Sequence, residues 1–156
     1  MASFAAPGRT APEPPRRPES VLVIVYAASG ETLLLKRRQP FDFWQSVTGS
    51  LLEGEAHADA AVRELREETG FTSEGELTFS GRQRDFVIDP RWRHRYPEGV
   101  TVNTEYEWQY RLPEVREPVL HEAEHCASRW LPIDEAIDTV WSWTNREALV
   151  EIRNTL

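Results

Sequence analysis

Residues 49–71 read GSLLEGEAHADAAVRELREETGF, and the regular spacing in this stretch is the strongest structural signal of the chain. Alanine and charged residues over 57–69 predict a helix, and Gly70 ends it because glycine readily adopts the left-handed conformation found after helices. One arc of this helix is apolar and is expected to pack on the body of the protein. That arc comprises Ala58, Ala61, Val62 and Leu65.

The neighbouring arc carries three carboxylates. Glu64, Glu67 and Glu68 are spaced i, i+3 and i+4, so a helix gathers them within about 100° of arc. Like charges this close repel one another, and Mg²⁺ or Mn²⁺ would offset the repulsion because hard cations prefer oxygen ligands. The alternative is a solvated acidic face whose charge is balanced by Arg63 and Arg66. The helix by itself leaves both interpretations open.

The residues around this helix resemble the Nudix hydrolase family, whose box has the pattern G-x5-E-x7-R-E-U-x-E-E-x-G-U, with U an apolar residue. Every specified position of the box is occupied by the required type of residue in this chain. The matching residues are Gly49, Glu55, Arg63, Glu64, Glu67, Glu68 and Gly70, with Leu65 and Phe71 at the apolar places. This resemblance favours the metal-binding interpretation of the acidic helix.

The resemblance implies a loop–helix–loop in which Glu64 and Glu68 bind a divalent cation, with Mg²⁺ expected and Mn²⁺ a substitute. Glu67 and Glu68 are then candidate catalytic residues, and Arg63 is expected to tether Glu55. It also implies cleavage of a diphosphate linked to another moiety. Clustered cations would neutralise the phosphate oxygens and hold a water in line for attack at phosphorus. Gly49 and Gly54 are expected to allow the tight loop backbone.

Outward from the helix, the chain alternates between strand and helix signals. Residues 20–27 (SVLVIVYA) form a β-branched apolar run, which is typical of a strand covered on both faces. The fold class is therefore α/β, a Nudix-type α/β/α sandwich around a mixed sheet in one domain over 20–156. Residues 1–19, rich in proline and arginine, are expected to form a mobile tail. Further strands are predicted at 32–38, 46–52, 76–88, 104–112 and 125–131, with helices after Pro132 and from Thr144.

Composition narrows the class of protein. The chain has 156 residues, with 18 basic and 26 acidic side chains and a formal charge of −8. An acidic chain is a poor partner for nucleic acid or an anionic membrane, and no apolar run approaches the ~20 residues that span a bilayer. The single cysteine, Cys126, excludes an internal disulfide and favours the cytoplasm. The expected partner is a small-molecule triphosphate, and the oligomeric state stays open.

Outside the box, several segments resemble the dihydroneopterin triphosphate diphosphatases of bacterial folate synthesis. They are FWQSVTGS (43–50), RHRYPEGVTVNTE (93–105), EHCASRWL (124–131) and SWTNRE (142–147). The resemblance implies hydrolysis of dihydroneopterin triphosphate to the monophosphate and pyrophosphate. Two segments match less well, the arginines at 16–17 and residues 85–92. The substrate-binding residues expected from it are Arg16, Arg37, Thr48, Phe86, Val87, Ile88, Asp89 and Ser142.

The same resemblance makes Glu124 a third metal ligand or the base that deprotonates water, with a surface ion pair as the alternative. Five arginines over 82–95 form a basic segment that would suit a triphosphate, unless each pairs with an acidic neighbour. Aromatic side chains would stack on a flat ring or belong to the core. These side chains are Phe43, Trp44, Trp92, Trp141 and Trp143.

Two other functions compete with this one. A nucleoside triphosphate pyrophosphohydrolase that removes oxidised or ordinary nucleotides would use the same box, because pterin and guanine share a hydrogen-bonding edge. A non-catalytic Nudix module that senses a ligand would be expected to lack box carboxylates, and here all of them are present. Activity on a panel of triphosphates separates these alternatives.

Overall fold

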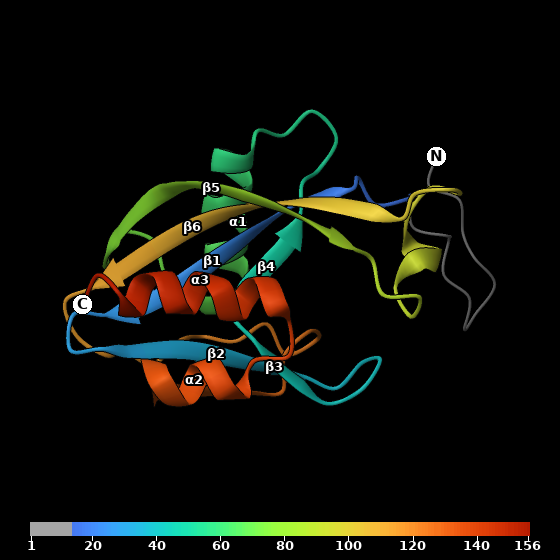
Figure 1. Cartoon of the computed structure of the whole chain (residues 1–156). Helices are drawn as coiled ribbons and strands as arrows, with labels where there is room; N and C mark the ends of the chain where they lie inside the picture. Colours follow the sequence, from blue (N-terminus) through green and yellow to red (C-terminus); the bar gives the residue numbers. More distant parts are fainter. Residues whose placement is uncertain (1–13) are drawn as a thin grey trace.

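A computed structural model describes residues 14–156 and shows a mixed seven-stranded sheet with three helices (Figure 1). Its central strand, β1, runs parallel to β6 and antiparallel to β2 and β4; β5 extends the sheet beyond β6, and β3 and β7 pair with β2. The strands are β1 (Glu19–Ala27), β2 (Glu31–Arg37), β3 (Phe43–Gln45), β4 (Val47–Ser50), β5 (Glu76–Val87), β6 (Val102–Leu112) and β7 (Ala127–Pro132).

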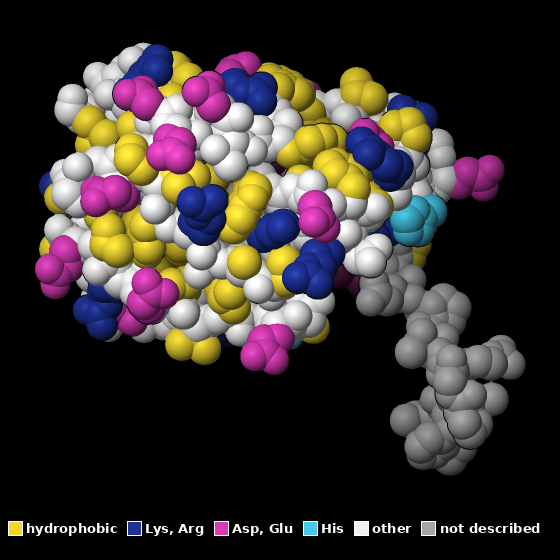
Figure 2. Space-filling view, turned by 90° about the horizontal axis from the view of Figure 1, so that it is seen from below, with side chains coloured by type: hydrophobic (Ala, Val, Ile, Leu, Met, Phe, Trp, Pro, Cys, Tyr) yellow, Lys and Arg dark blue, Asp and Glu magenta, His cyan; other side chains and the backbone are white. Residues whose placement is uncertain are grey.

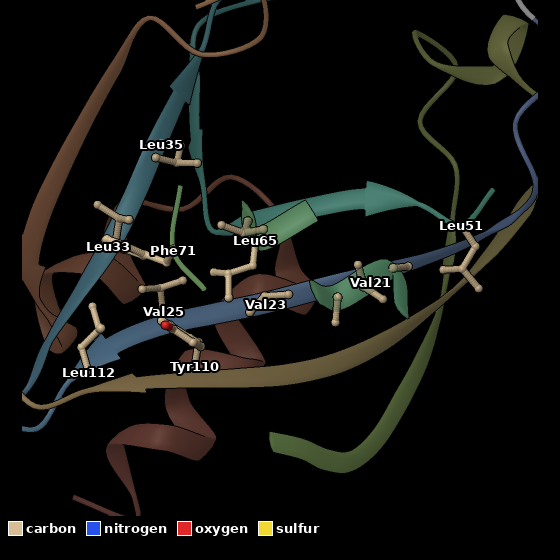
Figure 3. Close-up of a cluster of buried hydrophobic side chains, with 13 residues drawn as sticks. Val21, Val23, Val25, Leu33, Leu35, Leu51, Leu65, Phe71, Tyr110 and Leu112 are labelled. Atoms are coloured by element: carbon tan, nitrogen blue, oxygen red, sulfur yellow. The ribbon is translucent and has the colours of Figure 1, made fainter. Parts of the chain in front are cut away.

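Helices cover both faces of the sheet. Helix α1 (His57–Thr69) packs on one face, and α2 (Ile133–Thr139) and α3 (Trp143–Arg153) pack on the other (Figure 1). Strand β1 supplies both cores, because successive side chains of a strand point to opposite faces. Val21, Val23 and Val25 face α1, as Figure 3 shows, whereas Leu22 and Ile24 face α2 and α3. The predicted α/β/α sandwich is confirmed.

Helix α1 has the predicted bounds, but its buried face differs from the expected one. Gly70 takes a φ of 78° and donates its N–H to the Arg66 carbonyl at 2.8 Å, which ends the helix as predicted. Ala58 and Val62, assigned to the packed face, are exposed. The buried residues of α1 are Ala60, Ala61, Glu64, Leu65, Glu68 and Thr69. The packed face is thus rotated, and it carries two of the carboxylates inward.

The segment ahead of β1 lies against the folded body, which corrects the predicted boundary of the tail. Arg16 donates its backbone N–H to the Arg95 carbonyl at 2.7 Å. Arg17 donates to the backbone carbonyls of Leu52 and Glu55 at 3.1 and 3.0 Å. The folded part therefore begins before residue 20, because these bonds hold the chain over the loop ahead of α1. The rest of the predicted tail, residues 1–13, lies outside the described residues.

The surface in Figure 2 shows acidic and basic side chains interspersed with apolar ones over the face that it presents. Among residues 14–156, no helix combines the length and the apolar character needed to cross a membrane. Strand β3, which the sequence pattern does not predict, is only three residues long. It matters for the site because it positions Phe43 and Gln45 at the rim of the sheet.

Candidate active site

A cluster of acidic side chains forms where α1 meets the segment before β7. Glu64 and Glu68 lie on the inner side of α1, and Glu124 and His125 come from the distant segment. One ligand atom each from Glu68, Glu124 and His125 lies within 4.8 Å of the others. We call Glu64, Glu68 and Glu124 the carboxylate cluster. The structure therefore brings the predicted metal-binding residues together, Glu124 included.

Burial disfavours the ionised form of the carboxyl groups of Glu64 and Glu68. Burial raises the pKa of Glu68 well above its usual range, and the nearby carboxyl groups of Glu64 and Glu124 raise it further. Burial likewise raises the pKa of Glu64. His125 stands 3.4 Å from Glu68, but burial lowers the pKa of this histidine to about 4, so it is neutral at pH 7. Within residues 14–156, no lysine or arginine forms an ion pair with Glu68.

The donor set fits a hard divalent cation. Both carboxylate oxygens of Glu68 are buried without a hydrogen-bond donor among the described residues, although buried polar atoms normally have a partner. Glu64 and Glu68 face each other as two acceptors, an arrangement that a bound cation stabilises. Oxygen ligands of this kind suit Mg²⁺ or Mn²⁺ better than softer metals. The acidic face is therefore not a solvated surface at Glu64 and Glu68.

Arg63 fastens the loop before α1 to the helix, as expected. Its guanidinium donates to both carboxylate oxygens of Glu55 at 2.9 Å, and to the Ser50 carbonyl at 3.1 Å. It also donates to Glu64 at 2.7 Å, which orients that carboxylate. The bond from Arg63 holds the pKa of Glu55 below its usual range. Glu67 differs, because its side chain is 47% exposed and only meets Arg63 at 3.3 Å.

The first glycine of the box is required for space. A Cβ added at Gly49 would overlap the carboxylate of Glu64, so any side chain there would displace a proposed metal ligand. The φ of Gly49 is not positive, whereas Gly54 has a φ of 73°. The expectation that both glycines serve the loop backbone therefore holds for Gly54 and is wrong for Gly49.

Two adjoining cavities form one cleft beside the cluster. The first, here called the aromatic cavity, is lined by aromatic side chains from several elements: Phe43, Phe86, Trp92, Tyr96 and Trp141. The second, the carboxylate cavity, is lined by Glu64 and Glu124. Both cavities share a wall of five residues, Arg16, Arg37, Thr48, Gly49 and Ser50. The cleft thus connects the aromatic cavity to the carboxylate cavity, and Arg16 and Arg37 lie at the junction.

Seven of the eight predicted substrate-binding residues line the aromatic cavity. They are Arg16, Arg37, Thr48, Phe86, Ile88, Asp89 and Ser142. Val87 is absent from the lining and is 68% exposed, because alternation along β5 turns it away from its neighbours Phe86 and Ile88. Asp89 is already engaged by the Arg91 side chain at 2.9 Å, which lowers the pKa of that carboxyl to about 2.

Only some of the aromatic side chains that were candidates for ring stacking line the aromatic cavity, and several arginines of the basic segment are paired with acidic residues. Phe43, Trp92 and Trp141 line the aromatic cavity and pack on one another, with ring centroids 5.2 to 5.8 Å apart. Trp44 and Trp143 are not part of its lining. In the basic segment, ion pairs engage three arginines. Arg82 and Arg84 pair with Glu107, and Arg91 pairs with Asp89.

Sequence reasoning missed several polar residues of the aromatic cavity, among them Gln45 and Glu105. Glu105 lies on β6 between Asn103 and Glu107, and all three are buried. Polar residues that alternate with Thr104 and Tyr106 along a strand predict a solvated face. The pattern therefore predicts that Glu105 is exposed, whereas the structure buries it. The available signal was the position of Glu105 at the end of a segment that resembles known diphosphatases.

Comparison with known proteins agrees with this geometry. A family profile described as the NUDIX domain matches residues 16–151. The chain is 44% identical over 138 residues to dihydroneopterin triphosphate diphosphatase of Escherichia coli (strain K12), covering 86% of this chain and 91% of that protein. A Haemophilus influenzae protein of the same description is 31% identical over 135 residues, 84% of each chain.

A solved structure extends the comparison to the fold. The structure of the E. coli dihydroneopterin triphosphate pyrophosphohydrolase superposes with a TM-score of 0.83 at 40% sequence identity. The match covers 89% of this chain and 97% of that one. The resemblance therefore extends over most of the fold.

Proposed function

The chain is a Nudix hydrolase, and from this premise we propose that it hydrolyses dihydroneopterin triphosphate to dihydroneopterin monophosphate and pyrophosphate. The observation that carries the proposal is the shared wall between the aromatic and carboxylate cavities. A flat ring in the aromatic cavity would direct its phosphates past Arg16 and Arg37 toward the carboxylate cluster. The named relatives support the same substrate, because the matches cover nearly their whole length.

Each part of the cleft has a task in this reaction. Glu64, Glu68 and Glu124 would hold Mg²⁺, which when bound neutralises the phosphate oxygens and makes a water more acidic. Arg37 and Arg16 bind the phosphate chain, since arginine donates to phosphate oxygens in a bidentate manner. Glu124, 46% exposed at the mouth of the cluster, serves as ligand or accepts the proton of the attacking water. Glu67, whose carboxylate accepts from Arg63 at 3.3 Å, is the further catalytic residue of this proposal.

We further propose that the reaction takes place in the cytoplasm, where the exposed thiol of Cys126 stays reduced. The proposed partner is the small-molecule triphosphate, with no nucleic acid or membrane surface required. A second candidate function, nucleoside triphosphate pyrophosphohydrolysis, is favoured by the same cavity. A guanine ring has the flat shape and the hydrogen-bonding edge of a pterin, so aromatic stacking alone does not separate them.

Pyrophosphate release from a panel of triphosphates, with Mg²⁺ varied, tests the proposal. The panel contains dihydroneopterin triphosphate, GTP, an oxidised guanine nucleotide and ATP. We expect the highest kcat/KM for dihydroneopterin triphosphate, and no activity after chelation of divalent cations. A higher kcat/KM for a guanine nucleotide would replace the leading function by the second one.

A further inference from the structure

One buried acid of the aromatic cavity has no task in the chemistry described above. Glu105 lies on β6 opposite Ser20 of β1, is only 6% exposed, and lines the cavity. Its Oε1 atom is buried without a hydrogen-bond partner among the described residues. It is distant in sequence from the carboxylate cluster and does not line the carboxylate cavity. An acceptor buried in this way is destabilising unless something binds to it.

Three other polar side chains of the same cavity already have hydrogen-bond partners. Asn145 accepts from the Ser46 N–H and donates to the Ser46 hydroxyl, both at 2.9 Å. Thr48 donates to the Val21 carbonyl at 2.9 Å. Ser142 shares a hydrogen bond with Thr144 at 2.9 Å. None of these three has the unpaired buried atom that marks Glu105.

Gln45 offers the aromatic cavity a hydrogen-bond donor, which complements the acceptor of Glu105. Its side-chain nitrogen is buried without a hydrogen-bond partner in the part of the chain that the structure describes, and Gln45 lines the aromatic cavity together with Glu105. Among the described residues, Glu105 thus supplies an unused acceptor and Gln45 an unused donor beside the aromatic rings. The Nε atom of Arg37 is a second unpaired donor of this cavity, and the proposed function assigns that arginine to the phosphates. Flat walls with a few placed polar groups are typical of a ring-binding site.

We propose that Glu105 is a specificity-determining residue that accepts hydrogen bonds from the ring N–H and exocyclic amine of the substrate, while the Gln45 amide donates to the ring carbonyl. The ligand class is a fused ring with a 2-amino-4-oxopyrimidine edge, which pterin and guanine share. Adenine is disfavoured because its ring nitrogen at this edge is an acceptor and would face the carboxylate. The inference rests on the proposed function for the orientation of the ring in the cleft.

The environment of Glu105 suits this task. Burial raises its pKa to about 7, while a hydrogen bond from Thr144 and the charge of Arg84 favour the ionised form. Two N–H donors from a ring would add to that stabilisation, since charge-assisted hydrogen bonds are the stronger kind. Arg84 is itself held by Glu107 at 2.7 Å, so it does not compete for the ring.

The test compares GTP with ITP, which lacks only the exocyclic amine. Wild-type enzyme is expected to prefer GTP in kcat/KM by about 10- to 100-fold, the scale of a hydrogen bond to a charged group. Glu105→Gln should bring this ratio near one. Glu107→Gln, a buried acid on the same face of the same strand but outside the cavity, is the matched control. It should keep the wild-type ratio, because a glutamine oxygen still accepts from Arg84. Gln45→Leu should weaken both substrates alike, because both carry the ring carbonyl.

A binding measurement without phosphates or metal provides an independent readout. Unphosphorylated dihydroneopterin, titrated in EDTA and followed by quenching of tryptophan fluorescence, should bind Glu105→Gln about tenfold or more weakly than Glu107→Gln. If Glu105→Gln fails to fold, wild-type enzyme is assayed with GTP methylated on the ring N–H, which should lose a similar factor. An unchanged rate with that analogue would overturn the proposal.

The outcomes separate this inference from the proposed function. If dihydroneopterin triphosphate is not hydrolysed but the preference for GTP over ITP depends on Glu105, the function is wrong and the ring-reading role stands. If dihydroneopterin triphosphate is hydrolysed and Glu105→Gln keeps both the GTP-to-ITP ratio and the affinity for dihydroneopterin, the role of Glu105 is wrong and the function stands.

Discussion

Replacing Glu68 by glutamine is expected to stabilise the metal-free protein while abolishing its response to Mg²⁺. Glutamine has nearly the same shape, but it removes a charge from a fully buried site next to Glu64 and Glu124. The folded-state pKa of Glu68 is raised, so above its ordinary value of 4.5 the unfolded chain releases a proton that the folded protein retains. Stability is therefore lost as the pH rises, and the variant is spared this loss.

The magnitude follows from the burial of a carboxylate beside two other carboxyl groups. Removal of that charge is worth about 1–3 kcal/mol, because the glutamine amide donates toward Glu64 where a carboxylate only accepts, and a protein of this size gains roughly 2–4 °C in Tm for each kcal/mol. Thermal melts at pH 8 in EDTA should then place Glu68→Gln several degrees above wild type. Glu67→Gln is the control on the same helix. Because the Glu67 side chain is 47% exposed, the Tm of this variant should hardly differ from that of wild type.

Addition of Mg²⁺ reverses the order of wild type and variant. A cation at 100 times its Kd stabilises the folded state by about 2.7 kcal/mol, which wild type should gain and Glu68→Gln should largely lose. Activity of the variant should fall by roughly 10²-fold or more, the range for losing a catalytic charge. A variant that melts below wild type in EDTA, or that responds to Mg²⁺ as wild type does, would refute the reasoning.

Three further substitutions test other parts of the cleft. Gly49→Ala should lower kcat by roughly 10²-fold while the circular dichroism spectrum stays unchanged, because the new Cβ displaces the Glu64 carboxylate. A normal kcat would show that the space left by Gly49 is not needed to position Glu64. Arg37→Ala should cost about 1–3 kcal/mol in kcat/KM, to the same extent for pterin and guanine triphosphates, because phosphate contacts do not read the ring; unequal losses in parallel steady-state assays would assign this arginine to the ring. His125 has a folded-state pKa of about 4 against 6.5 for the free side chain, so its contribution is complete above pH 6.5 and is lost as the pH falls toward 4. His125→Gln should flatten the decline of unfolding free energy over that window, as measured by urea titrations at successive pH values, and an unaltered slope would show that another group causes the decline.

Local spacing predicts the metal-binding half of the site well. The positions of Glu64 and Glu68 in one helix, and the end of that helix at Gly70, follow from helix geometry alone and are confirmed. The orientation of the helix does not follow in the same way. Apolar patterning places Val62 inward, yet the helix buries Glu64 and Glu68. Gly49 of β4 leaves room for the Glu64 carboxylate, and Arg63 of α1 itself donates to it.

The sequence also predicts those strands of the sheet that are long and apolar. Residues 20–27 were expected to be covered on both faces, and β1 supplies both cores. Strand β3 was missed because three residues carry no detectable period. The anchoring of residues 16–17 was missed because it depends on backbone carbonyls of Leu52, Glu55 and Arg95, which no side-chain pattern encodes.

The aromatic cavity escapes sequence reasoning for a structural reason that also bears on specificity. Its walls come from segments far apart in the chain, with Gln45 on β3, Glu105 on β6 and Trp141 ahead of α3. The carboxylates of α1 need only helical spacing, whereas the cavity needs the whole sheet to be assembled first. If Gln45 and Glu105 read the ring as proposed, substitutions there should change which ring is bound without displacing Glu64 or Glu68. A family with one metal-binding helix can acquire different substrates in this way, because the residues that select the ring are not the residues that cleave the phosphate chain.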